Sequence, residues 1–128
     1  MKPAVRKNDV ALIESFLDTL WAEQGLSNNT LSAYRGDLER YSRWAQHNGV
    51  ELPNAEQKDL QMFLGECVVA GVKPRTTARQ LSSLRRFYRY LLRETIIERD
   101  PSAEIESPRL GRTLPVSLNE KEVEDLLA

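Results

Sequence analysis

One pattern dominates the chain from Asn8 to Thr95: apolar residues recur at helical spacing, and a glycine follows each of the first three runs, at positions 25, 49 and 71. A glycine just past such a run is typical of the left-handed residue that ends a helix. No stretch alternates apolar and polar residues as a half-buried strand would. The predicted helices span, in order, residues 10–24, 28–48, 55–70 and most of 73–95. The sequence therefore predicts an all-α fold, a compact four-helix bundle with short connections.

Short polar residues precede the apolar runs where helix N-caps are wanted. Asn8 or Asp9 is the expected cap of the first helix, and Ser27 that of the second. Asn54 followed by Gln57 resembles a capping box for the third helix. These residues predict where each helix begins.

The fourth segment, KPRTTARQLSSLRRFYRYLLRET, carries seven basic residues and one acid, which gives it a charge of +6. At about 100° per residue its side chains divide between two opposite faces of a helix. The apolar face holds Ala78, Leu81, Leu84, Tyr88, Leu91 and Leu92. The opposite face holds Arg75, Arg79, Ser82, Arg86, Arg89 and Arg93. One face is expected to enter the core while the other presents a row of guanidinium groups.

A row of exposed arginines repels itself unless something anionic lies along it, and nucleic acid is the first candidate. The whole chain has a net charge of only -1, because residues 51–72 (one basic, four acidic) and 96–128 (four basic, eight acidic) are acidic. Two simpler interpretations remain open. The face is merely solvated, or acids of a neighbouring helix neutralise it.

The start of the second helix offers further polar residues: Asn29 and Thr30 in its first turn, and Arg35 beside its apolar stripe. The free N–H groups of a helix N-terminus bind phosphate well. Ordinary capping explains the first-turn residues equally well, whereas Arg35 is less easily explained in this way.

Catalytic and metal-binding motifs are missing from the sequence. The single cysteine, Cys67, lies in an apolar run, and the single histidine, His47, has no companion ligands. No glycine-rich phosphate loop or nucleophile motif occurs. No apolar run approaches the length of a membrane span, so a reducing, cytoplasmic setting is predicted.

Beyond residue 95 the pattern changes. Residues 96–116 contain three prolines without helical periodicity and predict an extended linker. Residues 117–128 begin with a capping box, Ser117 and Glu120, and predict a short helix. The apolar face of that helix has no partner in the chain, which predicts that a further domain follows.

Three segments together resemble the N-terminal part of tyrosine recombinases, and most closely the bacterial Xer group. They are TLSAYRGDLERYSRWA, TTARQLSSLRRFYRYL and DPSAEIESPRLGRTLPVSLNEKEVEDLL. The resemblance covers essentially the whole chain and implies a core-binding domain (1–95) of SAM-like type, a linker (96–116) and the beginning of a catalytic domain (117–128).

In that family the core-binding domain clamps one face of duplex DNA while the catalytic domain grips the other, and its second and fourth helices face the major groove. The resemblance implicates Asn29, Thr30, Arg35, Arg75, Thr76, Arg79, Gln80 and Arg86 in binding DNA. Lys73, Ser82, Arg89 and Arg93 complete the expected DNA-binding set.

The family's catalytic arginines, lysine, His-x-x-Arg pair and nucleophilic tyrosine would belong after residue 128. The resemblance thus implies a chain that binds a recombination core site without cleaving it. It further implies a cofactor-independent parent enzyme that works with a partner recombinase in a tetrameric synapse.

Two alternatives are carried forward. One is a helical interaction module whose basic face docks on an acidic protein. The other is a small helical transcription regulator, which the long helices disfavour because they supply no short helix-turn-helix pair.

Overall fold

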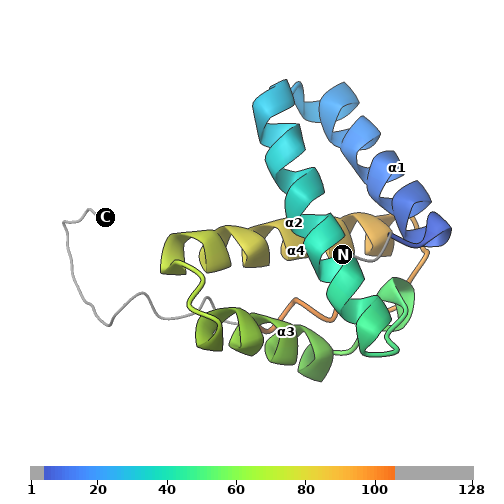
Figure 1. Cartoon of the computed structure of the whole chain (residues 1–128). Coiled ribbons are helices and arrows are strands. Elements are labelled where there is room, and N and C mark those ends of the chain that lie inside the picture. The colour runs from blue at the N-terminus through green and yellow to red at the C-terminus, as the bar shows by residue number, and fades with distance from the viewer. Residues whose placement is uncertain (1–4, 106–128) are drawn as a thin grey trace.

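The computed structural model describes residues 5–105 (Figure 1), and all regular structure within that range is helical. The elements are α1 (Lys7–Gln24), α2 (Asn28–His47), the 3-10 turn η1 (Leu52–Asn54), α3 (Gln57–Val69) and α4 (Pro74–Arg93). The prediction of an all-α fold with four helices is confirmed. Residues 106–116 of the predicted linker and the predicted helix at 117–128 lie outside the described residues.

The four helices form two antiparallel hairpins, α1 with α2 and α3 with α4 (Figure 1). Helix α4 packs against each of the other three helices, and α2 crosses it. This central position requires a side of α4 that is apolar over its whole length. Leu81, Leu84, Phe87, Tyr88 and Leu91 supply that side, each at most 1% exposed.

Aromatic side chains join the hairpins in the core. The rings of Phe16 and Phe87 meet edge to face at 5.6 Å, and Tyr41 packs on Phe63 at 5.2 Å. The hydroxyl of Tyr88 donates to the carbonyl oxygen of Leu52 at 2.8 Å and lies 2.8 Å from the hydroxyl of Tyr41. Because the Tyr88 hydroxyl donates its hydrogen to the Leu52 carbonyl, Tyr41 is the donor of the hydrogen bond between the two hydroxyls.

Two helices begin as predicted. Ser27 is the N-cap of α2, and its Oγ accepts from the backbone N–H of Thr30 at 3.2 Å. Pro74 occupies the first turn of α4, where its missing N–H costs nothing. Gly25 ends α1 with φ of 62°, and its N–H donates to the carbonyl of Trp21.

The predicted starts of α1 and α3 are wrong. Helix α1 begins at Lys7, one turn early, so Asp9 is not a cap but a buried residue inside the helix. Its carboxylate accepts from Arg6 and Ser42. These bonds favour a helical backbone in the residues just before Asp9. Helix α3 starts at Gln57, with the side chain of Asp59 accepting from the N–H of Glu56.

The chain after α4 turns back onto the bundle. Ile97 and Ile105 are buried in the core, and the Arg85 guanidinium donates to the carbonyl of Ile105. Ser102 is buried and donates to the carboxylate of Asp100 through both its N–H and its hydroxyl. Residues 96–105, expected to be the first part of an extended linker, thus contribute to the packing of the helices.

Some apolar residues of the helices lie on the surface instead of in the core. Trp21 is 62% exposed, and Val10 and Val68 are exposed as well. The apolar residues of α1 and α3 spread over a wider arc than α2 and α4 cover, so those at its margin stay in water. None of the helices in the described part of the chain combines the length and apolar character needed to span a membrane.

Candidate nucleic-acid interface

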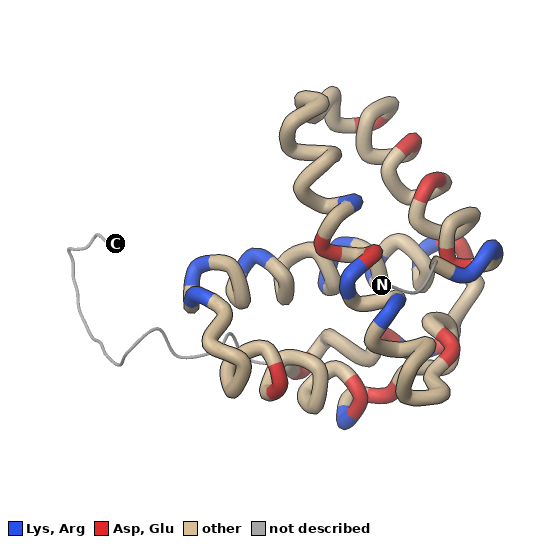
Figure 2. The backbone as a smooth tube through the Cα atoms, in the orientation of Figure 1, with Lys and Arg blue, Asp and Glu red and all other residues tan. Residues whose placement is uncertain are grey.

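Basic residues recur along α4 (Figure 2), and the predicted row lies on the side of the helix away from its buried residues. We call it the α4 ridge: Arg75, Arg79, Ser82, Arg86, Arg89 and Arg93. Five of these residues are exposed and Arg86 is half-buried. The ridge forms because its residues, Ser82 included, recur at three- and four-residue intervals, which places them along one side of a helix.

Partners from other helices meet part of the ridge. Arg93 forms an ion pair with Glu23 of α1, with nitrogen–oxygen distances of 2.9 and 3.2 Å. This bond raises the pKa of the Arg93 guanidinium. Arg86 donates to the side-chain oxygen of Gln24 at 3.1 Å and lies 5.7 Å from the centre of the Tyr34 ring. The alternative that neighbouring acids neutralise this face therefore holds for Arg93, whereas the partners of Arg86 are uncharged.

Arg75 and Arg89 differ from these. Neither forms an ion pair or a side-chain hydrogen bond with any residue in 5–105. Both are exposed, and they lie near the two ends of the ridge. Within the described residues they are the ridge arginines that are exposed and have no side-chain partner.

The centre of the ridge is fixed by a buried carboxylate of α2. The Asp37 side chain is 0% exposed and accepts from Arg79 in a bidentate pair, Nε to Oδ2 at 3.0 Å and Nη2 to Oδ1 at 2.9 Å. Arg40 also donates to Oδ1 at 2.9 Å, and the Ser83 hydroxyl donates to Oδ2 at 2.8 Å. We call these four residues the Asp37 cluster. The pairing raises the pKa of the Arg79 guanidinium.

Gln80 lies beneath this cluster. It is 2% exposed, and its side-chain amide donates to the backbone carbonyl of Asp37 at 2.6 Å. The sequence placed Gln80 among residues that contact DNA, but its position on α4 faces α2 rather than solvent. Thr76, by contrast, is half-buried, and Lys73 is exposed at the N-terminal end of α4.

The candidate residues of α2 lie apart from the ridge. Arg35 turns toward α1, where Nε and Nη2 each lie 2.8 Å from an oxygen of Glu14. This pair lowers the pKa of the Glu14 carboxyl. Asn29 is exposed in the first turn of α2, and Thr30 accepts a hydrogen bond from Ser27. Within residues 5–105 no hydrogen bond joins these α2 residues to α4.

Sequence reasoning missed two residues of the site, Asp37 and Arg40. Asp37 follows Tyr34 by three residues and precedes Tyr41 by four, so it lies on the apolar stripe of the second helix. An acid on such a stripe is the available signal, because a buried carboxylate needs cationic partners. Arg40, half exposed, follows three residues later and supplies one of them.

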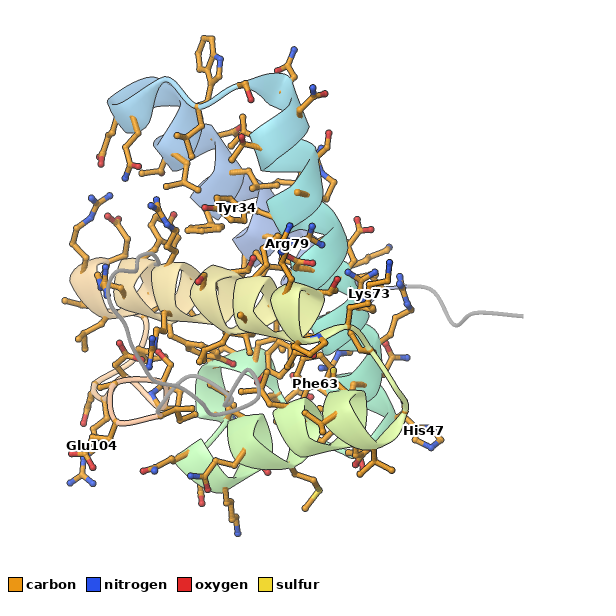
Figure 3. The ribbon with its side chains drawn as sticks, turned by 90° about the vertical axis from the view of Figure 1, so that its left-hand side faces the viewer. Tyr34, His47, Phe63, Lys73, Arg79 and Glu104 are labelled. Carbon is orange, nitrogen blue, oxygen red and sulfur yellow. The ribbon has the colours of Figure 1, made fainter. Side chains whose placement is uncertain are left out.

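The sign of the charge varies over the molecule. Lys73 and Glu104 lie near opposite ends of α4 (Figure 3), with Arg79 beside α2 between them. The outer face of α1 and the lower edge formed by α3 carry acids (Figure 2). Within residues 5–105 no group of three His, Cys, Asp or Glu side chains is arranged to hold a metal ion. Burial raises the pKa of the Cys67 thiol, as suits a packing residue rather than a nucleophile.

Comparison with known proteins identifies the family of the chain. A family model described as phage integrase, N-terminal SAM-like domain, matches residues 13–95, from α1 to the end of α4. The tyrosine recombinase XerD of Shewanella oneidensis is 50% identical over 117 residues, which are 91% of this chain and 39% of that protein. XerD of Pseudomonas putida is 48% identical over 119 residues, 93% of this chain and 40% of that protein.

A third relative, XerD of Yersinia pestis, is 44% identical over 123 residues. The chain spans about 40% of the length of these relatives. The predicted resemblance to the Xer group of tyrosine recombinases is confirmed by these matches, all three of which are named XerD. The chain therefore belongs to the phage integrase N-terminal SAM-like domain family.

Proposed function

We propose that this domain is the DNA-binding half of a site-specific tyrosine recombinase and clamps duplex DNA at a recombination core site. The observation that carries the proposal is the α4 ridge, in which five arginines and Ser82 line the outward side of the central helix. Duplex DNA is a regular polyanion, and a straight cationic helix face matches a groove flanked by phosphates.

Within this proposal the ridge residues divide by role. Arg75 and Arg89, exposed and unpaired within the described residues, contact phosphates that flank the groove, and Lys73 and Arg93 extend the contact at the two ends. Arg79 and Thr76 lie where side chains reach base edges. Phosphate contacts set the register of the protein on DNA, and base contacts choose the site. Gln80 supports the interface from below, since it is buried against Asp37.

Helix α2 contributes a second surface in the proposal. Asn29 and Thr30 occupy the N-terminus of the helix, where backbone N–H groups favour an anionic oxygen. Arg35 lies five residues beyond Thr30, and its pair with Glu14 is about two-fifths exposed on each side chain. An exposed pair of this kind is weak, so a phosphate can compete with Glu14 for the guanidinium.

The wider role follows the relatives. They are named tyrosine recombinases, and the chain spans about two-fifths of their length. We propose that the parent protein breaks and rejoins DNA through a nucleophilic tyrosine in a following catalytic domain, without a cofactor. In a cytoplasmic, tetrameric synapse with a partner recombinase, that reaction would resolve chromosome dimers.

The rival is an interaction module whose basic ridge docks on an acidic protein. The two candidates share a dependence on salt, so salt alone does not separate them. Binding-site selection does: the chain is incubated with random-sequence duplex DNA, bound duplexes are amplified, and the cycle is repeated. Enrichment of one sequence, which then outcompetes random duplex, is the expected result. A chain that retains no duplex or enriches no sequence would refute the proposal.

A further inference from the structure

The Asp37 cluster has a feature that simple charge balance does not require. Two arginines from two helices, Arg40 and Arg79, share one carboxylate that is 0% exposed, while their own side chains are 51% and 46% exposed. A carboxylate is normally buried only where its hydrogen bonds are all supplied. Here the guanidiniums reach from the buried anchor out to solvent.

The anchor itself cannot move easily. The Ser83 hydroxyl holds Oδ2 at 2.8 Å, and the Gln80 amide holds the backbone carbonyl of Asp37 at 2.6 Å. Both residues belong to α4, so the cluster fastens α2 to α4 where the helices cross (Figure 3). Rotating the Asp37 side chain away would leave the buried Ser83 hydroxyl without its partner, while the Gln80 amide holds the backbone in place.

The pairing leaves part of each guanidinium available. Asp37 engages Nε and Nη2 of Arg79, so both N–H groups of Nη1 are unused by this carboxylate. Arg40 donates to Asp37 through Nη2. Two cations on one carboxylate leave a local charge of +1. The ordering entropy of long side chains is therefore lost on folding rather than on binding.

We propose that Asp37 is a positioning residue that holds Arg40 and Arg79 in fixed places for DNA to dock against. The proposal rests on the proposed function, because the docked partner is duplex DNA. It gives Arg40, outside the expected DNA-binding set, a place in the interface. The opposite model treats Asp37 as a competitor that must release Arg79 before DNA binds.

The substitution Asp37→Asn separates the two models, since it removes the anchor and adds one positive charge. The probes are a duplex obtained by the selection above and a random-sequence duplex, each fluorescently labelled and titrated against the full chain. Affinity for random duplex follows total charge and should not fall. Affinity for the selected duplex should fall by about tenfold, the equivalent of one ordered charge-assisted hydrogen bond. The ratio of the two affinities should drop accordingly.

Glu51→Gln is the matched control. Glu51 also accepts from an arginine, Arg6, and its substitution adds the same charge outside the interface. Its affinity ratio should equal that of the unsubstituted chain. An Asp37→Asn ratio equal to that of Glu51→Gln would overturn the positioning role. If Asp37→Asn binds the selected duplex more tightly than the unsubstituted chain does, and with a steeper salt dependence, the competitor model holds instead.

The experiment distinguishes failure of the proposed function from failure of the positioning role. If the unsubstituted chain selects no sequence, the proposed function fails, and the positioning role fails with it. If it does select one, the ratio tests the positioning role alone. Should circular dichroism show that Asp37→Asn does not fold, Ser83→Ala replaces it, since alanine suits a helix and the carboxylate stays. Loss of the hydroxyl should lower the ratio by about threefold, and an unchanged ratio in folded Ser83→Ala would refute the inference.

Discussion

Two buried acids, Asp9 and Asp37, hold this fold at points that apolar packing alone would leave unspecified. Each lies on the apolar stripe of its helix and joins that helix to another part of the chain. Asp9 accepts from Arg6 at 3.0 Å and from the Ser42 hydroxyl of α2 at 2.5 Å. A buried carboxylate stabilises a fold only while its partners remain, so each is a point where one substitution costs much.

Arg6→Gln tests this cost. The Arg6 guanidinium pairs with Asp9 and also donates to the carbonyl of Val50 at 2.7 Å. Its removal leaves the Asp9 carboxylate, 1% exposed, with the Ser42 hydroxyl alone. The free energy of unfolding should fall by about 3 kcal/mol, as expected for breaking a buried pair. Urea denaturation followed by circular dichroism measures it.

Arg35→Gln is the control for that experiment, because the pair of Arg35 with Glu14 is exposed to a similar extent on both sides. Solvent screens such a pair, so the loss should stay below about 1 kcal/mol. Equal losses for the two variants would show that burial of the carboxylate does not set the cost.

The buried tyrosines Tyr41 and Tyr88 predict instability at alkaline pH. Burial raises the pKa of both hydroxyls above the ordinary value. The folded state therefore keeps its protons while the unfolded chain loses them above about pH 10. Stability is complete below that pH and should fall above it by about 1.4 kcal/mol per pH unit for each buried tyrosine.

Tyr41→Phe isolates this effect. The substitution removes one of the two titrating groups and leaves the bond from Tyr88 to the Leu52 carbonyl in place. Urea denaturation between pH 9 and about pH 11 should give a shallower decline in the variant. A decline as steep as that of the unsubstituted chain would assign the alkaline unfolding to other groups.

At the scale of the helices, sequence reasoning found the start of α2, where a local signal decides, and missed the start of α1, where a tertiary partner decides. The start of α2 follows from Ser27, whose hydroxyl caps its own helix. The start of α1 depends on the hydrogen bond between Asp9 and Ser42, which are thirty-three positions apart in the chain. Periodicity does not reveal this contact. Leu52 is buried in the core and accepts from Tyr88, so η1 forms where a plain connector was expected.

The segment after α4 gives the element-scale prediction. Ile97 and Ile105 are 8% and 5% exposed, whereas the neighbouring Ile96 is 43% exposed. Ile97→Ala and Ile105→Ala should each lower the free energy of unfolding by about 2–3 kcal/mol through lost burial and the cavity left behind. Ile96→Ala, the matched control, should change it by less than about 0.5 kcal/mol.

Chemical denaturation of the three variants checks this ordering. A change for Ile105→Ala as small as that for Ile96→Ala would mean that the segment does not add to the stability of the bundle. The result also bears on the predicted boundary at residue 95, because it measures whether residues 96–105 belong energetically to the helical domain.

Over the whole molecule, the position of the ridge was predictable and its partners were not. The basic face of α4 follows from the spacing of its own residues, whatever the rest of the chain does. The acids that meet it, Asp37 from α2 and Glu23 from α1, come from other helices. Which arginines face solvent unpaired depends on helix packing, so the sequence could not distinguish Arg89 from Arg93.

This distinction leads to a prediction about salt. If about five phosphates are neutralised, the logarithm of the binding constant should fall with the logarithm of salt concentration with a slope of roughly -4 to -5. Arg75→Ala combined with Arg89→Ala removes two exposed guanidiniums, so the slope should become shallower by about 1.8.

Lys58→Ala removes an exposed positive charge from α3, on the acidic side of the molecule, and should leave the slope unchanged. Fluorescence titration of duplex DNA over a range of salt concentrations measures all three slopes. Equal slopes for the double variant and the unsubstituted chain would place the DNA elsewhere than on the ridge. The loss of a phosphate contact must reduce the number of counterions that are released on binding.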